Sequence, residues 1–197
     1  MRLEQLQAEF GDAITVVWRS FLLRPEAKPG GRPMDRFTEY TTNWARPADL
    51  EPGARFRVPW SGEHEPPSHS VPSAIGGKVA QLFGADVGAA FRMRLFEAYF
   101  GEHRTISRRS VLREVAIEAG IDGDAYDTAW NTYEDDLVRR VLEDHTTAVQ
   151  SEVTGVPAVV IDRTYLLPGA LDLEQYRKSL HHVLSRRETT PESEGTA

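Results

Sequence analysis

The 197-residue sequence contains no cysteine. This absence excludes disulfide bonds, thiolate metal sites and cysteine nucleophiles from the chain. Lysine is scarce as well, with 3 lysines against 20 arginines, a bias that is associated with GC-rich bacterial genomes. An excess of positive charge is also missing, because the formal net charge is −7. The charge argues against a nucleic-acid partner, which would require a basic surface.

Long apolar runs are absent too. No run approaches the roughly 18 residues that a membrane-spanning helix needs, so we expect no membrane partner. The first ten residues, MRLEQLQAEF, have the pattern of an amphipathic helix and not that of a signal peptide. We therefore expect a cytoplasmic protein. A composition of 40% hydrophobic and 27% charged residues is typical of globular domains.

The sequence also lacks the spacings of known catalytic and metal sites. His181 and His182 are neighbours on a predicted helix, so their side chains diverge by about 100° and do not form a metal-binding pair. No glycine-rich phosphate loop and no serine in a nucleophile elbow is present. We predict no catalytic residue and no metal ligand in these 197 residues.

The sequence does contain a helical block between two regions of β character. A strand is predicted over Ile14–Phe21, where β-branched and aromatic residues dominate. In the C-terminal part, Asp162–Thr164 separates two apolar runs and predicts an antiparallel hairpin, and Asp172 is the predicted N-cap of a closing helix. Helical periodicity favours further helices over residues 34–44, 70–84, 85–102, 105–121 and 124–149.

The segment TGVPAVVID, residues 154–162, places Pro157 directly before a β-branched run. Proline has no N–H for a sheet ladder, so it belongs at the first residue of a strand, at an edge or at a bulge. Its position has two readings. Pro157 either starts a strand and nothing more, or serves a role other than sheet stability.

This segment carries a family resemblance. TGVPAVVIDRTYLLPGALDLEQYRKSL resembles the closing β-β-α unit of DsbA-family thioredoxin-fold proteins, and it is most similar to the FrnE-like branch, which groups with the 2-hydroxychromene-2-carboxylate isomerases. MRLFEAYFGEHRTISRRSVLREVAIEAGID resembles that branch's helical insertion, and EFGDAITVVWRSFLLRP resembles its second strand and following loop. The likeness spans Arg2 to Leu184.

The resemblance implies an α/β fold with a thioredoxin-like sheet of DsbA type and an inserted all-helical subdomain. Residues 1–67 would form the N-terminal part of the thioredoxin-like domain, residues 68–150 the helical insertion, and residues 151–185 the C-terminal β-β-α unit. Residues 186–197, which are polar, are predicted to be a disordered tail.

The resemblance also implies a binding site. The Val156–Pro157 peptide would be cis, and the backbone of Gly155 and Val156 would pair with an extended peptide or a small-molecule ligand. Trp18 and Trp44 flank the long loop that borders the family's cleft, and Ser70 lies in a segment that nears the site. Core packing for the tryptophans and helix capping for Ser70 are the structural alternatives.

The family's first strand and its Cys-x-x-Cys turn, or the serine of the isomerases, have no counterpart here. Either the chain is part of a longer protein, or the fold is reduced to a binding module. A gap left by the strand would be filled by direct pairing of Ile14–Phe21 with the hairpin or by another chain. Thiol–disulfide exchange requires a thiolate, so we expect a relative of disulfide oxidoreductases and isomerases without redox activity of its own.

Two functional alternatives stay open at this point. One is a non-catalytic module that binds a peptide or small metabolite. The other is an isomerase or transferase that depends on a low-molecular-weight thiol, and such a thiol is the one cofactor that the resemblance suggests. A homodimer is a further open alternative.

Overall fold

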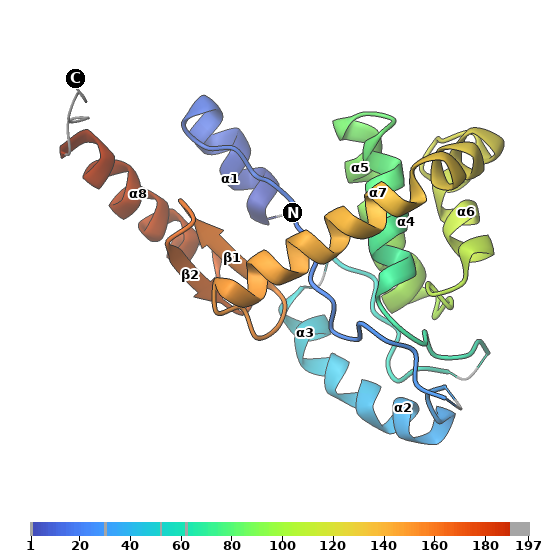
Figure 1. Ribbon diagram of the computed structural model, residues 1–197. Helices are drawn as coiled ribbons and strands as arrows, with labels where there is room; N and C mark the ends of the chain where they lie inside the picture. Colours follow the sequence, from blue (N-terminus) through green and yellow to red (C-terminus); the bar gives the residue numbers. More distant parts are fainter. Residues whose placement is uncertain (1, 30, 52, 62, 190–197) are drawn as a thin grey trace. The chain divides into compact units, whose positions relative to one another are not determined.

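The computed structural model describes residues 2–29, 31–51, 53–61 and 63–189, which form two compact units (Figure 1). One unit combines the residues up to Phe21 with those from Asp144 onward, and the other contains Leu22–Glu143. The helical unit therefore begins earlier than the expected boundary at residue 68. The reason is that Leu22 and the aromatic side chains between residues 37 and 60 pack in the clusters of that unit.

The helical unit confirms the helices that the periodicity predicts. Its core is formed by apolar side chains that recur at helical spacing on α4 to α7, including Ile75, Phe91, Leu112 and Leu137. The elements are α2 (Met34–Thr41), η2 (Thr42–Trp44), α3 (Ala45–Leu50), α4 (Val71–Gln81), α5 (Ala85–Phe96), the π-helical turn η3 (Glu97–Gly101), α6 (Arg109–Glu118) and most of α7 (Gly123–Gln150).

Local signals set the boundary between α6 and α7. Gly120 adopts a φ of +89°, its N–H donates to the Ile117 carbonyl at 2.9 Å, and the Ile121 N–H donates to the Ala116 carbonyl at 2.9 Å. These two hydrogen bonds make the Schellman ending that the Gly-Ile pair predicts. The next helix starts where the Asp122 carboxylate accepts the Ala125 N–H at 2.9 Å.

A second cluster in the helical unit buries Trp44 and Trp60, whose ring centroids lie 6.4 Å apart. The imidazole of His103 stacks on Trp60 at 4.6 Å and is fully buried. The Ser61 N–H donates to its Nδ1 at 2.9 Å, and its Nε2 donates to the Arg57 carbonyl at 2.7 Å. These partners require a neutral ring protonated on Nε2, and burial lowers the pKa of His103.

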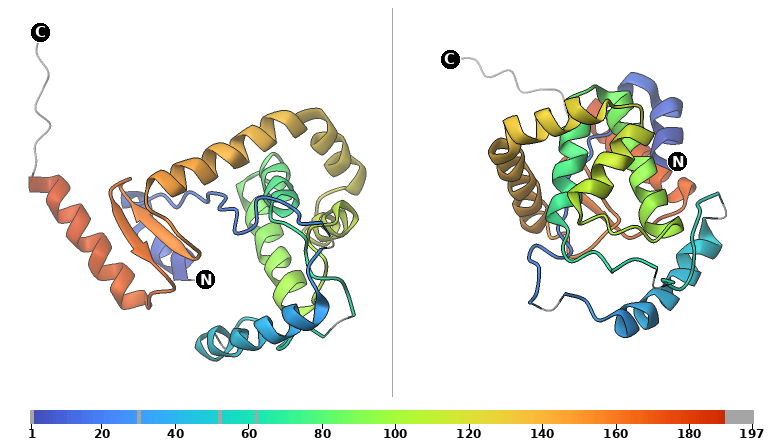
Figure 2. Two further views of the ribbon diagram at one scale, coloured as in Figure 1. Left: turned by 60° about the horizontal axis from the view of Figure 1, so that its bottom comes forward. Right: turned by 90° about the vertical axis from the view of Figure 1, so that its right-hand side faces the viewer.

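The other unit contains the sheet. In the described residues this sheet is an antiparallel hairpin of β1 (Ala158–Ile161) and β2 (Tyr165–Pro168), with the register running from Ala158 opposite Pro168 to Ile161 opposite Tyr165 (Figure 2). The predicted turn at residues 162–164 is confirmed. Asp162 and Arg163 occupy it with φ values of +54° and +59°.

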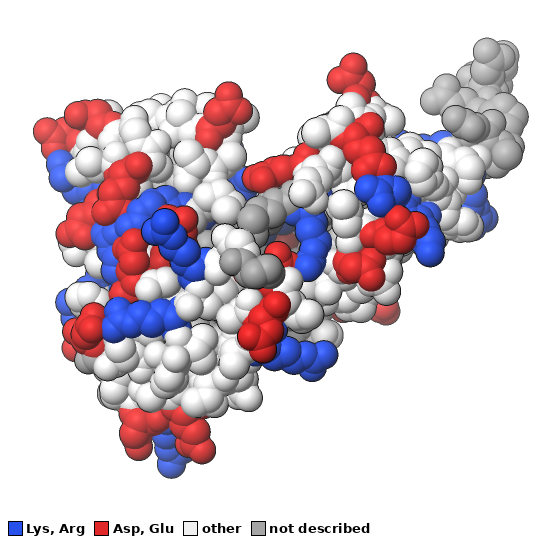
Figure 3. Space-filling view, turned by 180° about the vertical axis from the view of Figure 1, so that it is seen from behind, with Lys and Arg blue, Asp and Glu red and all other residues white. Residues whose placement is uncertain are grey.

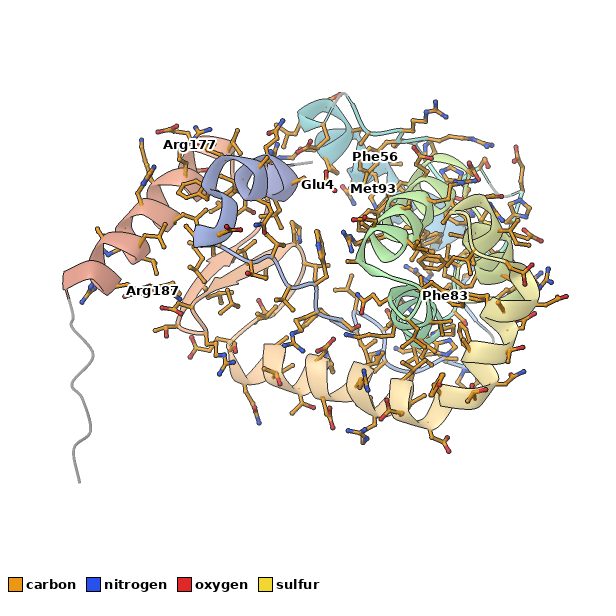
Figure 4. All side chains as sticks on the ribbon, turned by 90° about the horizontal axis from the view of Figure 1, so that it is seen from above. Glu4, Phe56, Phe83, Met93, Arg177 and Arg187 are labelled. Atoms are coloured by element: carbon orange, nitrogen blue, oxygen red, sulfur yellow. The ribbon has the colours of Figure 1, made fainter. Side chains whose placement is uncertain are left out.

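Helix α8 (Leu173–Thr189) follows the hairpin and packs with α1 (Arg2–Phe10), which continues into the short η1 (Gly11–Ala13). The predicted cap is confirmed, because the Asp172 carboxylate accepts the Gln175 N–H at 2.7 Å and the Gln175 side chain accepts the Asp172 N–H at 3.1 Å. Arg177 donates to both carboxylate oxygens of Glu9, at 2.6 and 2.8 Å. Figure 4 shows Arg177 on the part of α8 that lies beside α1.

The prediction of a strand over Ile14–Phe21 is wrong. The segment has no ladder partner among the described residues, and side chains bind its backbone instead. Gln7 accepts the Val16 N–H at 3.0 Å and donates to the Ile14 carbonyl at 2.7 Å. β-Branched residues favour an extended backbone, but a strand also requires a neighbouring strand. Direct pairing of this segment with the hairpin, one of the alternatives above, is therefore not observed.

The predicted tail begins later than residue 186, because α8 continues to Thr189. Arg187 extends this helix and donates to the Asp162 carboxylate at 3.1 Å, which ties it to the hairpin turn. The remainder of the predicted tail, residues 190–197, lies outside the described residues.

Two surface features bear on the expected partners. No helix in the described part of the chain is both long and apolar enough to cross a bilayer. On the face shown in Figure 3, basic and acidic side chains are interspersed.

Candidate functional site

The loop Thr154–Pro157 joins the end of α7 to β1. Its two ends are anchored. At one end, Val153 is buried and its backbone N–H donates to the Ala148 carbonyl at 3.0 Å. At the other end, the Pro157 carbonyl accepts the Gly169 N–H at 2.9 Å. The Val156–Pro157 peptide bond is cis, as the resemblance implied. Between these anchors the loop presents its residues to solvent.

Val156 is an exposed apolar residue of this loop, and Pro157 beside it is exposed as well. Val156 is 53% exposed. No described residue hydrogen-bonds its backbone N–H or carbonyl, and the same holds for Gly155. A backbone amide without a protein partner must find one in water or in a ligand. The N–H and carbonyl groups of Gly155 and Val156 can therefore form hydrogen bonds with an extended chain, as in peptide recognition by strand addition.

Trp18 belongs to the same unit as this loop and is 39% exposed. It lies in the extended segment that follows η1, and this segment is fixed by a buried carboxylate on α7. Asp144 accepts hydrogen bonds from the Arg19 guanidinium at 2.9 Å and from the Ser20 N–H at 3.0 Å. The backbone around Trp18 is thus anchored, and the Trp18 side chain remains accessible, as a binding role requires.

Trp44 and Ser70 belong to the helical unit, where each has a structural role. Trp44 is 8% exposed and is packed edge to face against Phe100, so its role is core packing, the structural alternative given above. Ser70 occupies the N-cap position of α4, but its hydroxyl makes no capping bond and accepts the Arg24 N–H at 3.1 Å instead. A second bond joins the Ser70 N–H to the Arg24 carbonyl at 2.8 Å.

Asp144 is a residue that the sequence analysis missed. A carboxylate in the middle of a long charged helix is usually read as part of a solvated face, yet this one is buried. Its neighbour His145 lies against Phe21, with ring centroids 5.0 Å apart. One feature of the sequence indicates this burial: Asp144 lies three residues after Val141, on the buried stripe of α7.

Among the described residues, no group of three or more histidine, aspartate or glutamate side chains is arranged to hold a metal ion.

The chain is similar to several known proteins. The family model for the DSBA-like thioredoxin domain matches residues 1–181. The Bacillus subtilis protein YwbO, which is uncharacterised, is 26% identical over 172 residues, or 86% of this chain and 82% of YwbO. DsbA of Escherichia coli K12, a thiol:disulfide interchange protein, is 30% identical over 93 residues. That match covers 43% of each chain, so the similarity spans less than half of DsbA.

Solved structures show the same fold at low identity. A Nitrosomonas europaea protein assigned as a protein disulfide isomerase superposes with a TM-score of 0.73 at 16% identity, covering 94% of this chain and 89% of that one. The cytosolic disulfide reductase DsbM of Pseudomonas aeruginosa superposes with a TM-score of 0.63 at 19% identity and covers 95% and 89%, and it has also been solved with glutathione.

Proposed function

Because the chain belongs to the DSBA-like thioredoxin domain family, we propose that it binds an extended peptide at the loop Thr154–Pro157 and that these 197 residues perform no redox step of their own. Thiol–disulfide exchange needs an attacking thiolate, and the sequence contains no cysteine. Recognition is then the part of the family's activity that this chain can carry. Within the family, the proposal places it in the FrnE-like branch.

The observation that carries this proposal is the state of Val156. Its backbone has no hydrogen-bond partner among the described residues, and its apolar side chain is half exposed. Both properties favour the binding of a peptide, because the peptide would supply the missing hydrogen bonds and cover the apolar side chain of Val156. In this proposal Trp18 of the same unit is a second apolar contact for the ligand.

A second candidate is a low-molecular-weight thiol such as glutathione, which would serve an isomerase or transferase reaction. Its support is that the structural neighbour DsbM was solved with glutathione. Glutathione is itself a short peptide, so the same loop would bind it. DsbM is described as cytosolic, which supports a cytoplasmic location as part of this proposal.

The test is a titration of the ¹⁵N-labelled full chain followed by amide chemical shifts. The probes are an acetylated seven-residue peptide of alternating valine and threonine and, separately, reduced glutathione. We expect the peptide to shift the amide signals of Gly155 and Val156. Unchanged signals at both residues with both probes would overturn the proposal, and shifts with glutathione alone would favour the second candidate.

Two valines provide a matched pair of variants. Val156 and Val149 are both 53% exposed and belong to the same unit, but Val149 lies on α7, seven residues before Val156 and outside the loop. We expect Val156→Asp to weaken peptide binding about tenfold, the effect of losing roughly one buried apolar contact. Val149→Asp should leave the affinity unchanged. Equal losses in both variants would show that the site is elsewhere.

A further inference from the structure

We propose that His103 is a pH-sensitive latch that holds Ser61. When the Nδ1 atom of His103 takes up a proton, Ser61 leaves the imidazole and water reaches the ring, while Arg57 stays bound to it. The latch lies in the helical unit and is independent of the peptide site at the loop Thr154–Pro157.

His103 has a backbone conformation that side chains rarely adopt. Its φ is +57°, in the left-handed region where glycine is the usual residue. The imidazole is nevertheless fully buried, and it stacks on Trp60 with an interplanar angle of 17°. A disfavoured backbone that the surroundings hold in place often belongs to a functional device. The partners of the ring indicate which device this is.

Both ring nitrogens bind the same short segment, one at each of its ends. The Ser61 N–H donates to Nδ1 at 2.9 Å, and Nε2 donates to the Arg57 carbonyl at 2.7 Å. A backbone N–H can only donate, so Nδ1 must stay unprotonated while its bond to Ser61 exists. The Ser61 hydroxyl, 3.2 Å from Nδ1, can turn to accept a proton on Nδ1, but the Ser61 N–H would then have no acceptor in the ring.

The rest of the segment keeps its bonds when the ring is protonated. Nε2 carries a hydrogen in the neutral and in the charged ring, so its bond to the Arg57 carbonyl survives. The Trp60 N–H donates to the Thr41 hydroxyl at 2.9 Å and does not involve the imidazole. Ser61 and the residues Glu63–Glu65 are exposed to solvent. Ser61 can therefore move into water without leaving a packed core.

The carboxylates around the ring are already paired with other cations. Glu63 acts on His103 through its charge, but its carboxylate binds Arg57 at 2.6 Å. Glu102, which precedes His103 in the chain, binds Arg94 at 2.7 Å and also pairs with Arg104. His103 itself forms no ion pair with any described residue. A protonated ring thus gains no dedicated counter-ion in the closed latch.

The remaining neighbours of the ring favour its neutral form. Trp44 and Trp60, the aromatic side chains that lie against it, are uncharged. Burial is the largest cause of the lowered pKa of His103, and the positive charges of Arg57 and His64 act in the same direction. An imidazole in water has a pKa of about 6.5. The open latch therefore binds a proton at a higher pH than the closed latch, and lowering the pH favours opening.

The size of the effect follows from this difference of one proton. The ratio of open to closed latch rises by up to about tenfold for each pH unit below about 6.5, until the lowered pKa of the closed ring is reached. Between pH 7.5 and 5.5 we therefore expect the open population to increase about tenfold.

The test is hydrogen exchange of the ¹⁵N-labelled full chain at pH 7.5 and 5.5, with rates corrected for the intrinsic pH dependence of amide exchange. The Ser61 amide reports opening of the latch, and the amide of Val115 in the core of the same unit reports global unfolding. His103→Asn is the matched variant, because asparagine tolerates a positive φ, offers an oxygen in place of Nδ1 and does not titrate. His64→Gln is the control for the neighbouring histidine.

We expect the corrected exchange rate at Ser61 to rise about tenfold in the wild type and in His64→Gln, and to stay constant in His103→Asn. An equal rise in His103→Asn, or its loss in His64→Gln, would overturn the inference. Equal acceleration at Val115 would also contradict it, because the chain would then unfold globally and no local latch would exist.

The ¹⁵N signals of the His103 imidazole provide a test that needs no variant. They should show hydrogen on Nε2 alone at pH 7.5, and protonation of Nδ1 should accompany the faster exchange at Ser61. A protonated Nδ1 together with a Ser61 amide that stays protected would show that the cation is retained over the face of Trp60, and the latch would be refuted.

Discussion

Gly76 on α4 faces the buried side chain of Tyr126, and this contact permits a quantitative test of the helical core. A Cβ atom added at Gly76 would lie 2.8 Å from the Tyr126 hydroxyl oxygen and 3.3 Å from Cδ1 of Leu112. Tyr126 has little freedom to withdraw, because it is fully buried and its ring lies 6.1 Å from that of Phe91 and 6.0 Å from that of Trp130. Its hydroxyl has no hydrogen-bond partner among the described residues.

The magnitudes follow from these contacts. Glycine to alanine inside a helix normally stabilises by about 1 kcal/mol, whereas overpacking a core costs about 1–3 kcal/mol. We expect Gly76→Ala to lower the free energy of unfolding by about 1 kcal/mol. Tyr126→Phe removes an unsatisfied buried hydroxyl, and we expect it to stabilise the protein by about 1 kcal/mol. With the hydroxyl gone, the alanine at position 76 should become stabilising.

The assay is urea unfolding of the four proteins, followed by tryptophan fluorescence. A double-mutant cycle should give a coupling energy of about 1–2 kcal/mol between the two positions. Gly77→Ala is the matched control, since a Cβ there meets no atom within 4 Å, and it should stabilise the protein. Additive effects of Gly76→Ala and Tyr126→Phe would refute the reasoning, as would a stabilising Gly76→Ala in the wild-type background.

Three further predictions concern other parts of the chain. The lowered pKa of His103 means that the unfolded state binds a proton first, so stability is full above about pH 6.5 and is lost as the pH falls below it; urea midpoints at pH 7 and 5 should differ more in the wild type than in His103→Gln. Asp144→Ala should cost about 2 kcal/mol in urea unfolding, because the Ser20 N–H loses its acceptor, and Asp144→Asn should cost less. Pro168 lies on β2 opposite Ala158 and has no N–H to offer a further strand, so Pro168→Thr should favour association and raise the sedimentation coefficient; a sedimentation coefficient equal to that of the wild type would contradict this.

Local signals in the sequence were sufficient for much of the fold. Gly120 and Asp172 define helix boundaries because each acts through hydrogen bonds to residues within five positions in the chain. The hairpin turn at residues 162–164 is local in the same sense. Ile14–Phe21 was predicted as a strand because its composition favours an extended backbone, but a ladder depends on residues far away in the sequence, which composition does not describe.

The candidate site was predicted only in part. The loop with Val156 and Pro157 was identified through the family resemblance, and it is exposed in the structure. Trp44 was named because of its place in the sequence, and neighbours that are distant along the chain bury it instead.

The unit that carries the loop is assembled from two distant parts of the chain, with Glu9 of α1 bound to Arg177 of α8. During synthesis, residues 22–143 leave the ribosome as one continuous piece and can fold as they emerge. The extended segment with Trp18 and the first helix must wait until residues 144–189 have been made. The loop Thr154–Pro157 is therefore completed late in translation, after the helical unit.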